Sequence, residues 1–330
     1  EAIGQSAMIT DGEIGFVATK LQYGLARNAS AKQACPNGFS RSFRENYEKK
    51  HPPKDSPAGK AESAYGGRLF YEAMKAPDGS NLCLKPELAT DPSARTVVRR
   101  DIEVYGIDLD GRSARANAPP APGTCAHDDF LDSRGSANID NQYYRVVGCT
   151  RGFLPGGLGE RLDSEMLEGA WTIVIAVKGV ENLRNDPNVE VSISAGADPI
   201  QLSPTGKALP YATYVMVADQ KFRATTKGRI VNGILYSNPV NVRFHFSANG
   251  KRFERSLNAG RLRLHLHSAA DAESYLSGYT SIADLYKNEI GFDGSTFIAG
   301  ASADAIGYTC NGMYSNLVRY ADGDRDPRTG

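Results

Sequence analysis

A run of alternating apolar and polar residues between Trp171 and His267 constrains the fold more than any other feature of the sequence. Near its end, Leu262, Leu264 and Leu266 alternate with Arg or His residues, so an extended segment here has one apolar and one polar face. Antiparallel sheets commonly bury one face and leave the other to solvent. The alternation therefore predicts an antiparallel sheet.

Segments rich in β-branched and aromatic residues recur through this stretch, and Gly, Pro, Asn or Asp separate them. Between two of the segments, Asn249-Gly250 supplies the residue types that a tight hairpin turn needs. We therefore predict a mainly β fold with some α: an antiparallel β-sandwich or jelly-roll-like body with flanking helices and long loops. The predicted strands cover residues 171–177, 189–195, 211–217, 228–236, 239–247 and 260–267.

Helical patterns follow the predicted sheet. Residues 281–290 begin with a Ser cap, carry an acidic residue three positions later and stop before Gly291. Residues 310–320 place apolar side chains at helical spacing, and a short helix is expected within 61–75. The patterns predict a mixed N-terminal region with a Pro-rich connection (1–100), an acidic, disulfide-closed cation-binding segment (101–160), the sandwich body (161–267), and a helical C-terminal region that packs on the sheet and ends in an interrupted loop (268–330).

The cysteines indicate the compartment. None of the five belongs to a CxxC pair, which favours structural disulfides over zinc or thiol-redox chemistry. The chain begins at Glu1 without an initiator Met, as a mature product does after removal of a signal peptide. We expect a secreted, periplasmic or cell-surface protein. The alternative is a cytosolic protein in which the five cysteines are reduced and buried.

The spacing of the cysteines also predicts a pairing. Cys125 and Cys149 enclose the most irregular acidic stretch, and closing this loop would stabilise the fold by about 3 kcal/mol. Cys35 would then pair with Cys83. Cys310 would be left with a partner beyond the last residue of the sequence.

Oxygen donors gather in the predicted cation-binding segment. On a strand ending at Gly111, Asp108 and Asp110 share one face, and a bend would bring both carboxylates to one ion. Calcium prefers six to eight oxygen ligands from carboxylates, amides and carbonyls. We therefore predict a Ca²⁺ site, whose ligands come from the residues Asp108, Asp110, Asp128, Asp140 and Asn141.

Two short motifs carry a limited resemblance to calcium loops. The run Asp108-Leu109-Asp110-Gly111 resembles the DxDG opening of calcium loops in secreted proteins. The tail that starts at Asp322 is similar to the DxDxD start of an EF-hand-like loop, although Pro327 stands where that pattern has Gly. Both resemblances imply oxygen coordination and no particular fold. Solvated Asp and Asn turns are the alternative explanation of these residues.

Charge and motifs narrow the function. With 38 basic and 38 acidic residues the chain is neutral, so we expect no nucleic-acid partner, and no apolar run reaches the ~18 residues of a membrane span. The GxSxG, HExxH and nucleotide-loop motifs are missing from the sequence. We favour a calcium-stabilised binding or assembly protein without catalytic activity, whose partner is a cell-surface protein or glycan.

Two other function classes stay open. A metal-assisted extracellular hydrolase would act on a polysaccharide or phosphoester, with His127 or Asp128 as its general base. A lectin-like module would bind an anion or glycan through the polar face of the predicted strands, where a solvated face is the simpler explanation. The basic residues of that face are Arg243, His245, Arg261, Arg263, His265 and His267.

Overall fold

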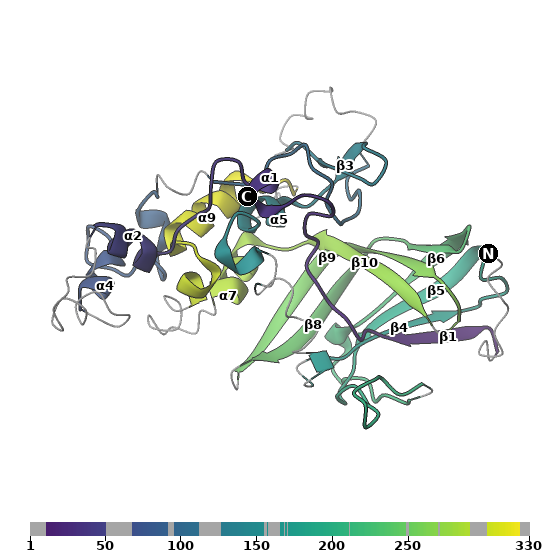
Figure 1. The fold of residues 1–330 in the computed structure, drawn as a ribbon. Coiled ribbons are helices and arrows are strands. Elements are labelled where there is room, and N and C mark those ends of the chain that lie inside the picture. The colour runs from purple at the N-terminus through teal and green to yellow at the C-terminus, as the bar shows by residue number, and fades with distance from the viewer. Residues whose placement is uncertain are drawn as a thin grey trace, which may run out of the picture. The chain divides into compact units, whose positions relative to one another are not determined.

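A computed structural model describes most of the chain (Figure 1). The described residues are 11–50, 68–91, 96–111, 127–154, 157, 166, 167, 169, 171–210, 212–248, 251–269, 271–290 and 302–323. The chain divides into two compact units, which are described separately. The sheet unit comprises Glu1–Gln22, Gly106–Gly111 and Arg161–Thr280, and the helical unit comprises Tyr23–Tyr105, Arg112–Glu160 and Ser281–Gly330.

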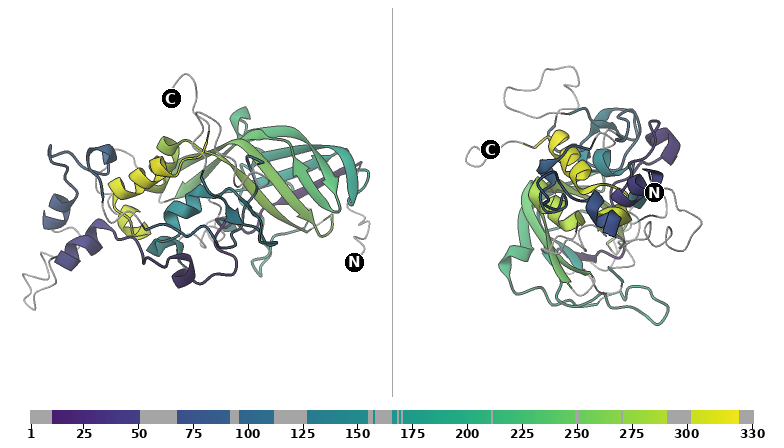
Figure 2. Two further views of the ribbon diagram at one scale, coloured as in Figure 1. Left: turned by 90° about the horizontal axis from the view of Figure 1, so that it is seen from above. Right: turned by 90° about the vertical axis from the view of Figure 1, so that its left-hand side faces the viewer.

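One antiparallel sheet of eight strands forms the sheet unit and curls into a half-barrel (Figure 2). Its order is β1-β4-β5-β6-β7-β9-β10, and β8 pairs with the remaining part of β9. The mainly β fold with an antiparallel body is therefore confirmed, and this sheet surrounds its core by curling on itself. Its strands are β1 (Glu13–Val17), β4 (Ile173–Lys178), β5 (Asn185–Ala195), β6 (Arg223–Val231), β7 (Ile234–Ser237), β8 (Val240–Ala248), β9 (Lys251–Leu266) and β10 (Ala272–Tyr279).

Alternate residues of each strand build the core of this unit. In β9, Leu262, Leu264 and Leu266 are buried, and they belong to the same hydrophobic cluster as Trp171. The turn between β6 and β7 consists of Asn232-Gly233, both with positive φ (52° and 79°). This conformation matches the twist of a two-residue hairpin and explains why Asn and Gly stand there.

In the sheet, one predicted strand is missing and one strand was not predicted. Residues 212–217 form no strand; Met216 makes one isolated bridge to Gly196, and Val215 is 63% exposed. Conversely, β10 lies in a region predicted to be helical. On the face of β10 opposite the buried leucines of β9, Ala272 is half-buried and Ser274 is exposed, so this face gives little apolar contrast. The sequence pattern alone therefore missed this strand.

The helical unit contains short helices and a two-stranded sheet. The predicted helices at 281–290 and 310–320 are confirmed as α7 and α9, and part of 61–75 forms α4. Thr309 caps α9, because its hydroxyl accepts a hydrogen bond from the Gly312 amide at 3.1 Å. The elements are α1 (Ala31–Ala34), α2 (Phe43–Lys50), α4 (Arg68–Ala73), η1 (Pro86–Leu88), β2 (Phe130–Leu131), β3 (Ala137–Ile139), α5 (Gln142–Val147), η4 (Arg151–Phe153), α7 (Ile282–Ile290) and α9 (Cys310–Arg319); η6 (Gln220–Phe222) belongs to the sheet unit.

Two disulfides stabilise the helical unit, and the predicted pairing is wrong. Cys35 bonds to Cys149 and Cys83 bonds to Cys310, with Cα–Cα distances of 5.6 and 4.8 Å. The prediction favoured neighbours in sequence, whereas the bonds follow packing: each lies within one of the unit's two hydrophobic clusters. Cys125 lies outside the described residues.

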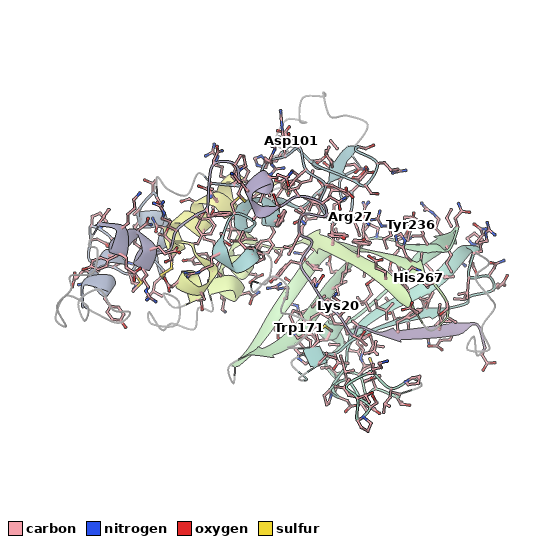
Figure 3. The ribbon with its side chains drawn as sticks, in the orientation of Figure 1. Lys20, Arg27, Asp101, Trp171, Tyr236 and His267 are labelled. Atoms are coloured by element: carbon pink, nitrogen blue, oxygen red, sulfur yellow. A yellow bond between two sulfur atoms is a disulfide. The ribbon has the colours of Figure 1, made fainter. Side chains whose placement is uncertain are left out.

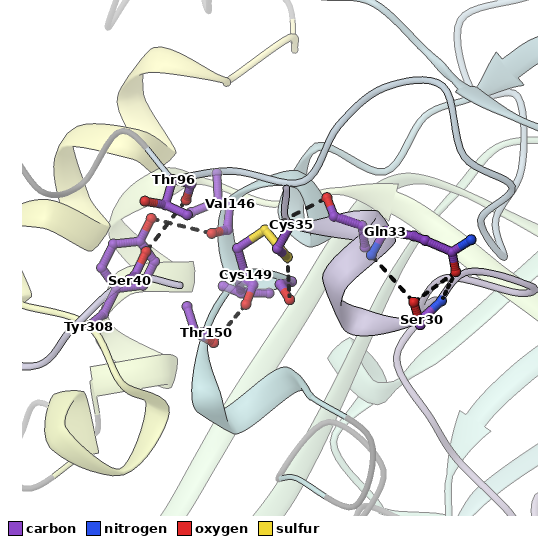
Figure 4. Close-up of a disulfide and its surroundings, with 12 residues drawn as sticks. Ser30, Gln33, Cys35, Ser40, Thr96, Val146, Cys149, Thr150 and Tyr308 are labelled. Carbon is purple, nitrogen blue, oxygen red and sulfur yellow. Dashed lines mark hydrogen bonds between the residues drawn. A yellow bond between two sulfur atoms is a disulfide. The ribbon is translucent and has the colours of Figure 1, made fainter. Parts of the chain in front are cut away.

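The surroundings of the Cys35–Cys149 bond show how it is held (Figure 4). Cys35 directly follows α1, which begins with a capping box between Ser30 and Gln33. On the other side of the bond, the Tyr308 hydroxyl donates to the Val146 carbonyl at 3.3 Å. The bond therefore links the end of α1 to the turn that follows α5, over a sequence separation of 114 residues.

We predict that replacing Cys83 and Cys310 together by Ser lowers the free energy of unfolding by about 2–5 kcal/mol, because the bond restricts a very long loop of the unfolded chain. Urea unfolding measures this loss. Cys125→Ser is the control, and its non-reduced peptide map should still contain the Cys35–Cys149 and Cys83–Cys310 peptides. In the wild-type protein, a peptide map with Cys125 linked to Cys149 would contradict the observed pairing.

Candidate functional site

The Asp108–Gly111 segment of the sheet unit is a tight turn, and the strand predicted for it is wrong. One carboxylate oxygen of Asp108 accepts a hydrogen bond from the Gly111 amide at 2.6 Å, and Gly111 has a φ of 71°. On either side of Asp108, Ile107 and Leu109 are buried. The side-chain alternation expected of a strand is thus present locally, but the Asp108 hydrogen bond closes a turn instead of extending a sheet.

The same turn brings two carboxylates together. A carboxylate oxygen of half-buried Asp108 and one of exposed Asp110 lie within 4.8 Å of each other. Two oxygens that each lie 2.3–2.6 Å from one calcium ion are separated by at most about 5 Å. The separation of these two oxygens therefore suits a shared cation.

The other predicted ligands, Asp128, Asp140 and Asn141, belong to the helical unit. Exposed Asp128 forms an ion pair with Arg100 at 2.6 Å. Half-buried Asp140 directly precedes Asn141, which caps helix α5. Asp128 and Asn141 thus have defined protein partners. Of the predicted ligands, Asp108 and Asp110 are the two that lie close together within the sheet unit.

Asn141 organises its surroundings through both atoms of its amide. Its oxygen accepts from the Tyr144 amide at 3.1 Å, and its nitrogen donates to the carbonyls of Gly24 and Tyr105 at 2.8 and 3.1 Å. A Cβ at Gly24 would lie only 2.4 Å from the Tyr105 oxygen, so only glycine permits this approach. The role of Asn141 in the structure is to join three segments of the helical unit.

Other acidic residues of the sequence serve local turns. The Asp132 carboxylate accepts from the backbone amides of Arg134 and Ser136 at 2.8 and 2.9 Å, in the turn between β2 and β3. Burial raises the pKa of Asp132, but these hydrogen bonds outweigh it and lower the pKa overall. In the acidic tail, the residues from Asp324 onward lie outside the described part.

The proposed general bases have structural surroundings. His127 lies 5.5 Å from the Tyr320 ring, measured between centroids, and burial lowers its pKa; the positive charge of Arg145 acts in the same direction. Backbone hydrogen bonds with Arg319 and Ala321 partly oppose this shift. His127 is therefore tied to the segment that ends α9.

Buried Arg145 is a structural residue that sequence patterns did not single out. It is 6% exposed, donates to the Gln142 side chain at 2.6 Å and to the Asp128 carbonyl, and lies 4.3 Å from the centroid of the Phe130 ring. Burial lowers its pKa. The local sequence around Arg145 does not indicate that this side chain is buried. Its contacts with Gln142, Asp128 and Phe130 are therefore seen only in the fold.

The predicted basic face divides into two parts. On β8, Arg243 forms an ion pair with Glu254 at 2.9 Å, and His245 packs edge-on against Phe222. The other four residues of the predicted face belong to the second half of β9 or directly follow it, and they lie on the face opposite the core. Arg261, Arg263 and His265 are half-buried and His267 is exposed; Tyr236 and His267 are labelled in Figure 3.

Comparisons with protein-family models, curated proteins and solved structures found no match. Among the described residues, no helix has both the length and the apolar character required to cross a bilayer. The functional argument therefore rests on the residues themselves.

We predict that Asn141→Ala destabilises the protein by at least about 1 kcal/mol, because α5 loses its cap and two carbonyls lose their donor. Asn141→Asp is the matched variant: it keeps the capping oxygen and lacks the amide donor. Because its second oxygen would face the two carbonyl oxygens, Asn141→Asp should also be less stable than wild type in chemical unfolding. Equal stability of Asn141→Ala and wild type would contradict this role.

A second prediction concerns pH. Burial lowers the pKa of His265; Arg263 and His267 lower it further, and Glu273 opposes them. In the unfolded chain a histidine has a pKa of about 6.5, and in the folded state the pKa of His265 is lower. As pH falls through this range, the unfolded chain takes up more protons than the folded state, so the contribution of neutral His265 to the free energy of unfolding is lost. In urea unfolding between about pH 7.5 and pH 5, His265→Gln should lose less stability than wild type. Exposed His267→Gln is the control, and parallel curves for wild type and His265→Gln would refute the prediction.

Proposed function

We propose that the protein is a secreted or periplasmic binding or assembly protein without catalytic activity, stabilised by calcium at the Asp108–Asp110 turn. Two buried, long-range disulfides support an oxidising compartment, where such bonds persist. The mainly β sheet unit supplies a large polar face for a partner. A cell-surface protein or glycan is the expected class of partner.

The observation that carries the calcium proposal is the close pair of carboxylates. Two negative oxygens within 4.8 Å repel each other, and a shared cation would offset this repulsion. The Gly111 hydrogen bond and the buried Ile107 and Leu109 restrict the backbone, so the pair is arranged before an ion arrives. Water and backbone carbonyls would complete the six to eight oxygens that calcium takes.

The hydrolase alternative is less well supported. It requires His127 or Asp128 to act as general base on a metal-bound water. His127 packs on Tyr320 with backbone hydrogen bonds, and Asp128 pairs with Arg100. These contacts favour structural roles for both residues.

We predict that calcium raises the melting midpoint and that a chelator at matched ionic strength reverses the rise. Binding to the folded state alone stabilises it by about 2.7 kcal/mol at a free calcium concentration 100 times the dissociation constant. Magnesium should stabilise less, because it demands a smaller octahedral shell. Differential scanning calorimetry with calcium, magnesium and chelator measures these differences, and identical midpoints in calcium and chelator would refute the site.

Substitutions of single carboxylates test where the calcium ion binds. Asp108→Asn and Asp110→Asn should each abolish the calcium-dependent shift. Asp132→Asn is the matched control, because its carboxylate bonds to its own hairpin turn; it should lower the midpoint and leave the calcium shift intact.

A further inference from the structure

A row of alternating arginines and tyrosines crosses the outer face of the sheet unit. Arg229 of β6 is paired in register with Tyr236 of β7, Tyr236 with Arg263 of β9, and Arg263 with Tyr275 of β10. Their neighbours Leu235 and Leu264 are buried in the core, so the four side chains share the opposite face. The register thus forms one line across four strands.

The aromatic rings hold the guanidinium groups in this row. The Arg263 guanidinium lies 4.9 Å from the centroid of the Tyr275 ring, and that of Arg229 lies 6.0 Å from the centroid of the Tyr236 ring. Such contacts orient a guanidinium over a ring and leave its charge in place. The row therefore presents ordered positive charges separated by flat apolar surfaces.

Within the described part of the chain, no carboxylate forms an ion pair with Arg229 or Arg263. Arg263 donates one hydrogen bond to the Gly106 carbonyl at 3.3 Å, and its buried Nε has no hydrogen-bond partner among the described residues. The nearest acid on β10, Glu273, accepts a hydrogen bond from the Tyr275 hydroxyl at 3.0 Å. The charges of the two arginines are therefore available to an anionic partner.

The spacing of the row matches a carbohydrate. Neighbouring strands lie about 4.8 Å apart, close to the length of one pyranose ring along a polysaccharide, so the two arginines are about 10 Å apart. A chain in which acidic and neutral sugars alternate places its acidic groups at this interval. Arginine pairs with carboxylate or sulfate through two parallel hydrogen bonds, and tyrosine rings pack on the apolar faces of sugars.

We infer that the row of Arg229, Tyr236, Arg263 and Tyr275 binds an acidic polysaccharide in which acidic and neutral sugars alternate. The inference rests on the proposed function, since it names the partner class of a binding protein. A single-stranded nucleic acid would also meet arginines and aromatic rings, but it carries a phosphate at every unit. The alternation of charge and the zero net charge of the protein favour the polysaccharide.

A titration calorimetry experiment tests the inference with a hyaluronan hexasaccharide, a neutral chitin hexasaccharide and an oligothymidylate. Hyaluronan should bind, and added salt should weaken its binding. The chitin oligosaccharide and the oligothymidylate should bind at least tenfold more weakly. Absence of hyaluronan binding, or equal binding of either other ligand, would overturn the inference.

Matched variants on one strand assign the binding to the row. Arg229→Gln should weaken hyaluronan binding about tenfold, the loss expected for one charge-assisted hydrogen bond. Lys227→Gln is the control, because Lys227 lies two residues away on the same face of β6, opposite Glu190. Lys227→Gln should bind hyaluronan as tightly as wild type does. Arg229→Gln should keep the melting midpoint of wild type. Equal losses in both variants would overturn the assignment to the row.

Repeating the titrations in calcium and in chelator separates this inference from the calcium proposal. If Arg229→Gln weakens binding in both solutions, the row is a glycan site whether or not calcium stabilises the fold. If calcium raises the melting midpoint and hyaluronan does not bind in either solution, the calcium site stands and the glycan site is refuted.

Discussion

The alternation along β9 is the constraint on which the rest of the sheet unit depends. Its first half pairs with β8, and its second half pairs with β7 and β10 at once. Leu262, Leu264 and Leu266 close the core, while the residues between them form the outer face. Because a slip of one residue would exchange the two faces, burial of the leucines also fixes the position of Arg263 between two tyrosines.

The sequence predicts those parts of this sheet in which local contrast is strong. The β8–β9 hairpin and the β6–β7 segments alternate clearly, and all are strands. Residues 211–217 have the same composition but form no strand in the part described. There, the Asp198 carboxylate accepts a hydrogen bond from the Val215 amide at 2.7 Å, and the Val217 amide donates to the Ala195 carbonyl. Strand propensity is local, whereas the choice between ladder and loop depends on partners that no single segment specifies.

The disulfide pairing does not follow from the sequence, for a related reason. Cys83 and Cys310 are separated by 227 positions and meet because both are buried in the cluster that contains Tyr286. Asp and Asn residues are ambiguous, since the chemistry that binds calcium also accepts backbone amides. Asp132 and Asn141 illustrate the second use. Only the three-dimensional contacts show which carboxylates serve backbone turns alone, as Asp132 does, and which also lie beside another carboxylate, as Asp108 does.

The acidic turn and the arginine row are connected through one segment of the sheet unit. Gly106, whose carbonyl accepts a hydrogen bond from Arg263, stands two residues before Asp108. Without a cation, the two carboxylates of the turn lower the positive potential around the row, and calcium would neutralise them. An acidic polysaccharide would then bind more tightly to the calcium-loaded protein. Because binding free energies are reciprocal, the polysaccharide would in turn raise the affinity for calcium. Electrostatics alone would therefore couple the two proposed sites, with no change of fold.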